Sequence, residues 1–258
     1  MNATLYAAKT GLSAQDLKLT YIANNIANAE STAYKAQRPE FAALMSKKVR
    51  EPSATEGAAA GGLQIGSGVQ AVGTVTDFSQ GIVQETKRKY DLMIQGDGFF
   101  KVIKEDGSEL YTRNGAFMVN EDGDLATHDN YLLEPSINIP DNATSVEIDR
   151  KGKVLVRYSD NPEGEELGEI ELYKFINPNG LLQLDGGMYA ATESSGDEIA
   201  GIGDEDGFGY LMQGYLEGSN VNTINEMVAM ITAQRAYDSS SKALQAANQT
   251  QQQLTQVI

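Results

Sequence analysis

The 258-residue chain contains no cysteine, no tryptophan and a single histidine. Without cysteine it cannot form disulfides, use a catalytic thiol or bind zinc through thiolates. His128 alone cannot supply a histidine-rich metal cluster. No run of about 18 apolar residues is present, so we expect no membrane span. The opening MNATLYAAKTG lacks the basic and apolar regions of a secretory signal, so we expect no cleaved signal peptide, and export by another route stays open.

Positive charge is also scarce, and its distribution is uneven. The net charge is −16, but residues 76–218 hold eleven Lys or Arg against twenty-nine Asp or Glu, whereas residues 1–50 are net basic and residues 219–258 are neutral. Nucleic acid is excluded as a partner, because phosphate contacts require clustered Lys and Arg. The acidic middle is interpreted as a solvated surface, with metal binding and charge steering as the alternatives.

Both ends of the chain carry apolar residues spaced alternately three and four positions apart. This spacing places the side chains on one face of an α-helix, as in a coiled-coil seam. Only Gln15 is polar in the N-terminal repeat, and Ser240 and Gln251 are polar in the C-terminal one. We predict two terminal helices whose partners are each other or other copies of the chain. The predicted assembly seam consists of Leu5, Leu12, Leu19, Ile22, Ile26, Met230, Tyr237, Leu244 and Leu254.

Between the helices the pattern changes twice. Residues 53–73 are rich in Gly and Ala and have little charge, which is typical of an extended linker. From about residue 74 to 217 apolar and polar residues alternate, as in half-buried strands. The alternating pairs are Ile137 and Ile139, Val146 and Ile148, Val154 and Val156, and Ile170 and Leu172. The predicted class is α+β, with an all-β central domain (74–218), a connecting region (36–73), and terminal helices (1–35 and 219–258) that pair as a coiled coil.

Glycine-containing turns separate the predicted strands. Glu-Asp-Gly occurs at 105–107, 121–123 and 205–207, and Arg-Asn-Gly occurs at 113–115. Because glycine readily adopts positive φ, all four are predicted hairpin turns. The start of the C-terminal helix is expected to be capped by Ser219 or Asn220.

Motifs that suggest chemistry are weak. Gly96-Asp97-Gly98 lacks the third glycine and the following helix of a dinucleotide site, so a tight hairpin is favoured. Residues 120–124 (NEDGD) lack the spacing and closing Glu of an EF-hand, so a solvated turn is favoured. Acidic pairs are too numerous to identify a hydrolase dyad. We expect no catalytic residue, no cofactor and no metal site, and His128 is interpreted as a surface histidine.

Two long terminal motifs are far more specific. The run LTYIANNIANAESTAYK (19–35) contains the core Ala23, Asn24, Asn25, Ile26, Ala27 and Asn28, and QGYLEGSNVNTINEMVAMITAQRAYDSSSKALQAANQ starts at Gln213 and contains Ser219, Asn220, Val221 and Asn222. Both runs resemble the paired signatures of bacterial flagellar rod and hook proteins. The middle segments IQGDGFFKV (94–102) and YTRNGAFMVNEDGDL (111–125) resemble the distal rod members of this family most closely. The low-complexity TEGAAAGG at 55–62 departs from the usual polar loop.

The resemblance implies a structural subunit that polymerises into a hollow helical drive shaft between motor and hook, with the β-domain outside. Implied partners are other copies, proximal rod proteins, the hook protein, P- and L-ring bushings, the rod cap and the flagellar export apparatus. The implied location is the basal-body rod in the cell envelope. Phe41 and Met45 match the family's Phe-x-x-x-apolar export element, with an apolar helix face as the alternative. The remaining alternatives are a proximal rod or hook protein, a carboxylate-dependent hydrolase with helical dimerisation arms, and an adhesin or calcium-dependent β-module.

Overall fold

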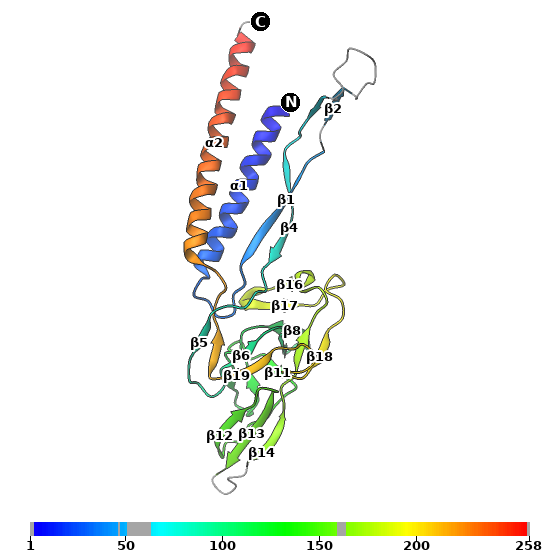
Figure 1. Cartoon of the computed structure of the whole chain (residues 1–258), viewed down its shortest axis with the longest axis vertical. Coiled ribbons are helices and arrows are strands. Elements are labelled where there is room, and N and C mark those ends of the chain that lie inside the picture. The colour runs from blue at the N-terminus through cyan, green and yellow to red at the C-terminus, as the bar shows by residue number, and fades with distance from the viewer. Residues whose placement is uncertain (1–2, 46, 51–62, 159–163, 257–258) are drawn as a thin grey trace. The chain divides into compact units, whose positions relative to one another are not determined.

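The structure, a computed structural model, describes residues 3–45, 47–50, 63–158 and 164–256. The chain divides into two compact units (Figure 1). We call residues 1–29, 36–77 and 221–258 the helical unit, and residues 30–35 and 78–220 the β unit. The chain is α+β, as predicted from its sequence. No helix in the described ranges combines the length and apolarity needed to cross a membrane.

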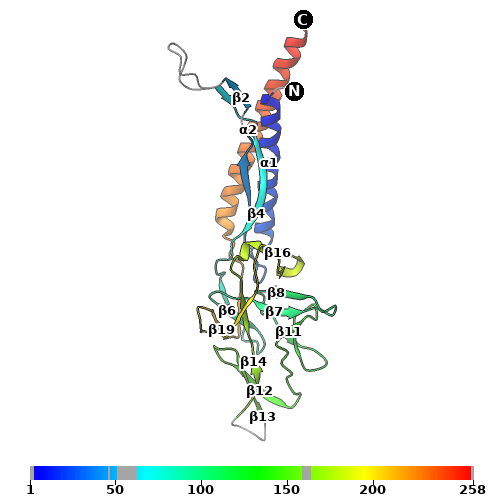
Figure 2. The same ribbon diagram turned by 90° about the vertical axis from the view of Figure 1, so that its right-hand side faces the viewer.

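The helical unit contains the two long helices. Helix α1 runs from Ala3–Ala27 and helix α2 from Thr223–Gln256. They pack against each other and lie side by side in both views (Figures 1 and 2). The predicted cap of α2 was wrong by at least two positions. The carboxamide oxygen of Asn222 accepts hydrogen bonds from the backbone amides of Ile224 and Asn225, each at 3.1 Å, which satisfies two amides at the start of the helix.

Paired strands accompany α1 in the helical unit. Strand β1 (Gln37–Ala43) pairs antiparallel with β4 (Val69–Thr76), and β2 (Lys47–Arg50) pairs antiparallel with β3 (Leu63–Ile65). Both β1 and β4 contact α1. These strands lie in the range predicted as a connecting region (36–73), except that β4 extends past it to Thr76. Residues 46 and 51–62 of that range are outside the described residues.

The β unit consists of short antiparallel strands in several sheets. The largest sheet has the order β16-β17-β8-β7-β11-β10-β9, another has the order β12-β13-β14, and two-stranded pairs form between β15 and β18, β19 and β6, and β20 and β5. The strand bounds are β5 Val83–Glu85, β6 Leu92–Gln95, β7 Phe100–Ile103, β8 Glu109–Thr112, β9 Met118–Val119, β10 Leu125–Ala126, β11 Leu132–Glu134, β12 Ala143–Ile148, β13 Lys153–Tyr158, β14 Glu165–Glu169, β15 Leu172–Lys174, β16 Leu182–Gln183, β17 Met188–Ala190, β18 Ile199–Gly201, β19 Tyr210–Gln213 and β20 Tyr215–Glu217. Two short 3-10 helices cover Pro178–Gly180 and Asp185–Gly187.

The predicted alternating residues enter the β-unit core, although not all lie in regular strands. All eight are buried and belong to one apolar cluster. Ile137 and Ile139 flank an isolated bridge at Asn138, and Ile170 lies between β14 and β15. Alternation therefore predicted burial at these positions, while regular strand pairing also required neighbours that the local pattern does not specify.

Only some of the predicted glycine-containing hairpin turns connect strands that pair with each other. Residues 105–107 connect the paired strands β7 and β8, and residues 121–123 connect β9 and β10, each with a glycine at positive φ. The turn at 205–207 also has a glycine at positive φ, but it connects β18 and β19, which do not pair. The hairpin predicted at Gly96–Gly98 was wrong, because β6 and β7 belong to different sheets.

The hairpin predicted at Arg113-Asn114-Gly115 was also wrong. Gly115 is buried, and a Cβ atom there would lie 1.7 Å from the carbonyl oxygen of Leu92. The amide of Leu92 donates to the carbonyl of Gly115 at 2.9 Å. Glycine is needed here for close approach of two backbones rather than for a turn.

Candidate functional site

The predicted seam residues lie on helices that contact each other, with different degrees of burial. Ile22 on α1 is buried, and Leu12, Leu19 and Ile26 are half-buried. On α2, Met230 and Leu244 are half-buried and Tyr237 is 38% exposed. The most buried described residue of α2 is Ala233, at 1% exposure, which belongs to the same repeat. The side chains of Leu5 and Leu254 lie outside what the structure describes.

The asparagine-rich motif at the end of α1 holds the helix to the strand that follows. Asn25 is buried, and its carboxamide donates to the carbonyl of Gln37 and accepts from the amide of Gln37, both at 3.0 Å. This reciprocal pair imitates a strand contact at the first residue of β1. The carboxamide of Asn28 donates to the carbonyl of Asn24 at 3.0 Å, which satisfies a carbonyl in the last turn of α1. Ala23 and Ala27 are exposed.

The second motif also has identifiable structural contacts. Ser219 and Val221 are buried. The carboxamide of Asn220 donates to the carbonyl and the hydroxyl of Ser79, at 3.2 and 3.1 Å. Asn222 caps α2, as described above. The motif therefore has two structural roles. Asn220 binds the end of the β unit to Ser79, and Asn222 caps the start of α2.

A buried ionic cluster, which we call the exit clamp, lies in the β unit and consists of Lys35, Arg113 and Glu217. The Lys35 Nζ atom is 2.7 Å from Oε1 of Glu217, and both side chains are fully buried. The guanidinium of Arg113 lies 3.6 Å from the other carboxylate oxygen and donates to the carbonyl of Gly96 at 2.8 Å. Two buried cations thus share one carboxylate, and removing that carboxylate would leave both uncompensated.

The exit clamp joins the three segments by which the chain passes into or out of the β unit. The chain crosses between the two units before residue 30, after residue 35, before residue 78 and after residue 220, so the segment 30–35 carries two of these crossings. The ammonium of Lys35 donates to the carbonyl of Ser79 at 2.7 Å, and the amide of Gly81 donates to the carboxylate of Glu217 at 2.8 Å. The amide of Ala33 donates to the carbonyl of Glu217 at 2.7 Å. Residues from all three segments therefore share one hydrogen-bonded centre.

A second ionic cluster surrounds Lys101. Its ammonium lies 3.0 Å from Glu109, 3.5 Å from Glu134 and 3.0 Å from Glu198. Burial alone would lower the pKa of Lys101, but hydrogen bonds to Glu109 and Glu198 and the nearby charges raise it above its ordinary value. The hydroxyl of Tyr111 donates to Glu198, and burial together with this bond raises the pKa of Tyr111. The cluster connects β7, β8 and β11 to the loop before β18.

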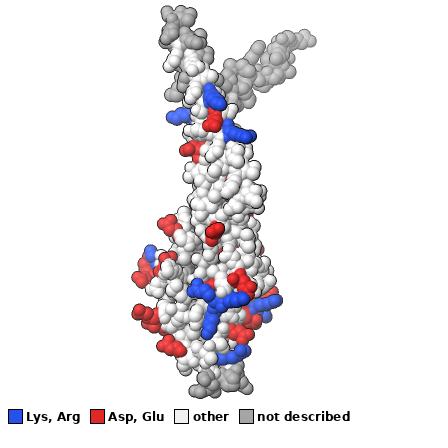
Figure 3. Space-filling view, turned by 90° about the vertical axis from the view of Figure 1, so that its left-hand side faces the viewer, with Lys and Arg blue, Asp and Glu red and all other residues white. Residues whose placement is uncertain are grey.

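Sequence reasoning missed an exposed apolar stripe on the first turns of α2. Ile224, Met227, Val228 and Ile231 are 71, 54, 59 and 51% exposed. Their spacing of three, four and seven positions places them on one helix face, and that spacing was readable in the sequence. The longer three-and-four repeat runs along the opposite face of the same helix, and it predicts only that face as a contact surface. Figure 3 shows one side of the molecule, where few charged side chains lie over the described part of the helices and many gather over the β unit.

The remaining residues that the sequence suggested as candidate sites lie in or next to exposed strands or turns. Phe41 is in β1 and Met45 follows it, at 38 and 92% exposure, so the helix-face alternative for this pair was wrong. His128 is exposed in a turn. The carboxamide oxygen of Asn120 accepts from the amides of Asp122 and Asp124, which accounts for the NEDGD turn without a metal. Among the described residues no group of three or more His, Cys, Asp or Glu is arranged to hold a metal ion.

Three family models match successive parts of the chain. The model described as "Flagella basal body rod protein" matches residues 5–35. The model described as "Flagellar hook protein FlgE/F/G D1 domain" matches residues 93–156. The model described as "Flagellar basal body rod FlgEFG protein C-terminal" matches residues 212–257. The two terminal matches cover the two sequence motifs.

Curated rod-protein relatives align over nearly the whole chain. The flagellar basal-body rod protein FlgG of Buchnera aphidicola subsp. Baizongia pistaciae is 37% identical over 97% of this chain and 98% of its own length. The FlgG of Agrobacterium fabrum is 40% identical, with 95% of each chain covered. The flagellar hook protein FlgE of Helicobacter mustelae is 34% identical, but over only 51% of this chain and 30% of its own. Rod proteins therefore match the chain far more completely than this hook protein does.

Proposed function

Since the chain belongs to the family of flagellar basal-body rod proteins, a structural family rather than an enzymatic one, we propose that it polymerises with copies of itself into the hollow helical shaft of the distal rod. The shaft carries torque from the motor to the hook. The full-length similarity to rod proteins is the observation that carries this proposal. Membership of a structural family also argues against the hydrolase alternative.

The two helices form the assembling part. Within each copy α1 and α2 pair as a coiled coil through the seam that includes Ile22 and Ala233, both buried. Copies then associate through the apolar residues that this pairing leaves exposed on α2, such as Ile224 and Met227. Buried apolar area is the main favourable term in such association, and a repeated contact that does not close generates a filament.

The exit clamp suits a torque-bearing subunit. Force that reaches the β unit must enter it through the three segments that Lys35 and Glu217 hold together. A buried, hydrogen-bonded ion pair such as Lys35–Glu217 resists local opening more than exposed contacts do. Torque is thereby shared among the covalent connections of all three segments.

The partners and location follow from the same function. The shaft joins proximal rod proteins at one end and the hook protein at the other, turns inside the P- and L-ring bushings, and grows beneath a rod cap. Its subunits leave through the flagellar export apparatus, with Phe41 and Met45 as the export element. The exposure of both side chains makes them accessible for recognition. The acidic β unit forms the outer wall of the shaft.

The function is tested with Leu244→Asp in a strain whose only copy of this gene carries the change. Leu244 is half-buried on the seam of α2, so a charge there disrupts helix pairing and assembly. We expect loss of motility and an unchanged thermal transition of the β unit. Gln245→Asp, at the exposed neighbouring position, is the matched control and should swim. A swimming Leu244→Asp strain would contradict the proposal.

A further inference from the structure

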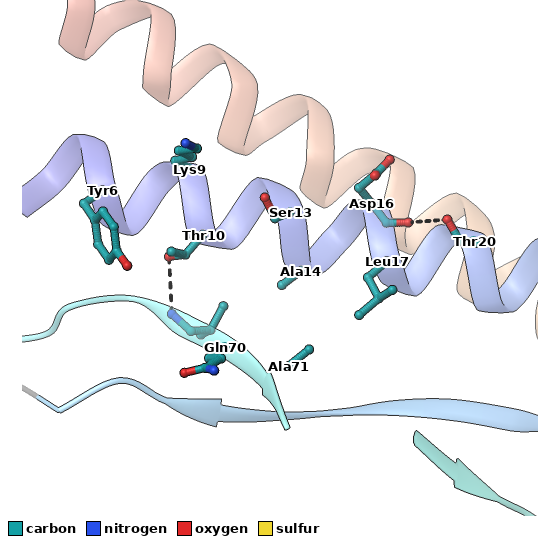
Figure 4. A pocket seen from close by; sticks show the side chains of 11 residues that line it. Tyr6, Lys9, Thr10, Ser13, Ala14, Asp16, Leu17, Thr20, Gln70 and Ala71 are labelled. Carbon is teal, nitrogen blue, oxygen red and sulfur yellow. Dashed lines mark hydrogen bonds between the residues drawn. The ribbon is translucent and has the colours of Figure 1, made fainter. Parts of the chain in front are cut away.

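A groove lies between α1 and β4 in the helical unit (Figure 4). Its volume is about 500 Å³. Ala14 and Leu17 of α1 and Val69 and Ala71 of β4 supply its apolar lining, and Leu17 points from the helix toward the strand. The backbone amide of Val69 donates to the hydroxyl of Thr10 at 3.3 Å, which fixes the strand to the helix at one end.

The groove has the form of a trough along a helix. Its lining extends from Tyr6 to Thr20 on α1, which corresponds to roughly 21 Å of helix length. Lys9 and Asp16 line it as well, so its charged residues cancel. A long, neutral and partly apolar trough fits the face of another helix better than a compact charged ligand.

The exposed stripe of α2 has the matching form. Ile224, Met227, Val228 and Ile231 occupy positions i, i+3, i+4 and i+7, which is the anchor pattern of a helix that lies in an apolar groove. The four residues cover about 10 Å of helix. All four are at least half exposed, so the stripe does not fill the groove of its own chain. From residue 227 to 234 α2 carries no charged side chain.

We propose that the groove between α1 and β4 receives the α2 stripe of a second copy of this chain. This proposal rests on the proposed function, since it names which surfaces meet when copies assemble. Charge favours this occupant. Two copies with a net charge of −16 repel each other, so they associate best where neither surface carries that charge. Both the stripe and the groove meet that condition.

The two surfaces also explain growth. The groove and the stripe are different surfaces, so the contact is heterologous and leaves one free groove and one free stripe on every pair. A third copy can therefore bind in the same way. A contact between identical surfaces would stop at two copies.

Cysteine cross-linking tests the contact, because the natural chain has no cysteine. The variant Ala14→Cys/Val228→Cys is produced as the only copy in flagellated cells, oxidised, and examined on a non-reducing gel. We expect a ladder of dimers, trimers and larger species that disappears on reduction. The matched control is Ala14→Cys/Asn225→Cys, since position 225 is exposed on α2 but is turned roughly 100° from Ile224. The control should give little ladder.

A second measurement uses purified protein, so it requires neither export nor a completed rod. Purified Ala14→Cys and Val228→Cys proteins are oxidised separately and as a mixture, and the mixture should give far more cross-linked dimer than either variant alone. No cross-link in either experiment, an equal ladder in the control, or an internal disulfide within a monomer would overturn the proposal.

The proposed function is scored separately by electron microscopy of basal bodies from the wild-type strain. Wild-type basal bodies that contain the chain in their rod, together with no groove-to-stripe cross-link, would overturn the docking proposal and leave the proposed function intact. Wild-type basal bodies without the chain would overturn both.

Discussion

Lys35 and Glu217 are 182 positions apart in the chain, yet their charged groups meet at 2.7 Å with both side chains fully buried. The pair lies where the segment after α1 and the segment before α2 both enter the β unit. Nothing in the local sequence around either residue indicates this contact. The contact forms because the three segments that connect the β unit to the helical unit converge in the completed fold. The Lys35–Glu217 pair holds these segments together through hydrogen bonds.

Glu217→Gln should destabilise the β unit strongly. The substitution leaves the ammonium of Lys35 and the guanidinium of Arg113 buried without a carboxylate, and breaking a buried ion pair in this way costs about 3–5 kcal/mol. Urea denaturation of the full chain, followed by far-ultraviolet circular dichroism and tyrosine fluorescence, measures the change. Glu205→Gln is the control, because its partner Lys151 is exposed and its loss should leave the midpoint unchanged. Equal midpoints for Glu217→Gln and wild type would refute the role of the clamp.

Stability should fall at alkaline pH. The pKa values of Lys101, Tyr111 and Tyr173 are raised, and burial raises the pKa of Tyr189 to about 12. Because each folded-state pKa lies above its unfolded value, the stability it contributes is complete below about pH 10 and is lost as the pH rises through the folded-state pKa. Melting temperatures measured from pH 8 to 11.5 should be level at first and then decline.

Tyr111→Phe separates one contribution to this decline. The variant loses a hydrogen bond to the Glu198 carboxylate, so it should be less stable at neutral pH by about 1.5–3 kcal/mol. It also lacks one titrating group, so its melting temperature should decline less steeply above pH 10. Tyr158→Phe removes a half-buried tyrosine of β13 in the same unit and serves as the comparison. A slope for Tyr111→Phe as steep as that of wild type would count against the assignment.

Gly115→Ala should unfold the β unit at a much lower temperature than wild type. The added methyl group would lie 1.7 Å from the carbonyl oxygen of Leu92, and backbone at this distance cannot yield without breaking the hydrogen bond between the two residues. Gly168→Ala is the matched control, because its Cβ would meet Ile137 at an ordinary 3.6 Å. Calorimetry of both variants gives the comparison, and two equal transitions would be the contrary result.

The sequence predicted what depends on local pattern. The terminal repeats correctly predicted helices, and alternation correctly predicted burial of Val146, Val154 and their partners. Local pattern could not predict that β6 and β7 enter different sheets, because strand partners are chosen by packing across the whole unit. Gly115 illustrates the same limit, since its neighbours suggested a turn while the actual constraint is a distant backbone.

The candidate site was predicted in part. The seam face of α2 was identified, but the opposite face with Ile224 and Val228 was not, although its spacing is present in the sequence. A single helix that carries two apolar faces indicates two sets of contacts. The exit clamp could not be predicted, since it depends on residues brought together only by the completed fold.

The central claim is that copies of this chain build the distal rod, and electron cryomicroscopy of purified basal bodies from cells that produce it tests this most directly. The account predicts density in the distal rod that fits repeated copies of the chain, with α1 and α2 of each copy around a central channel and the β unit on the outside. Distal rod density that another protein accounts for, in complete basal bodies from which this chain is absent, would contradict it.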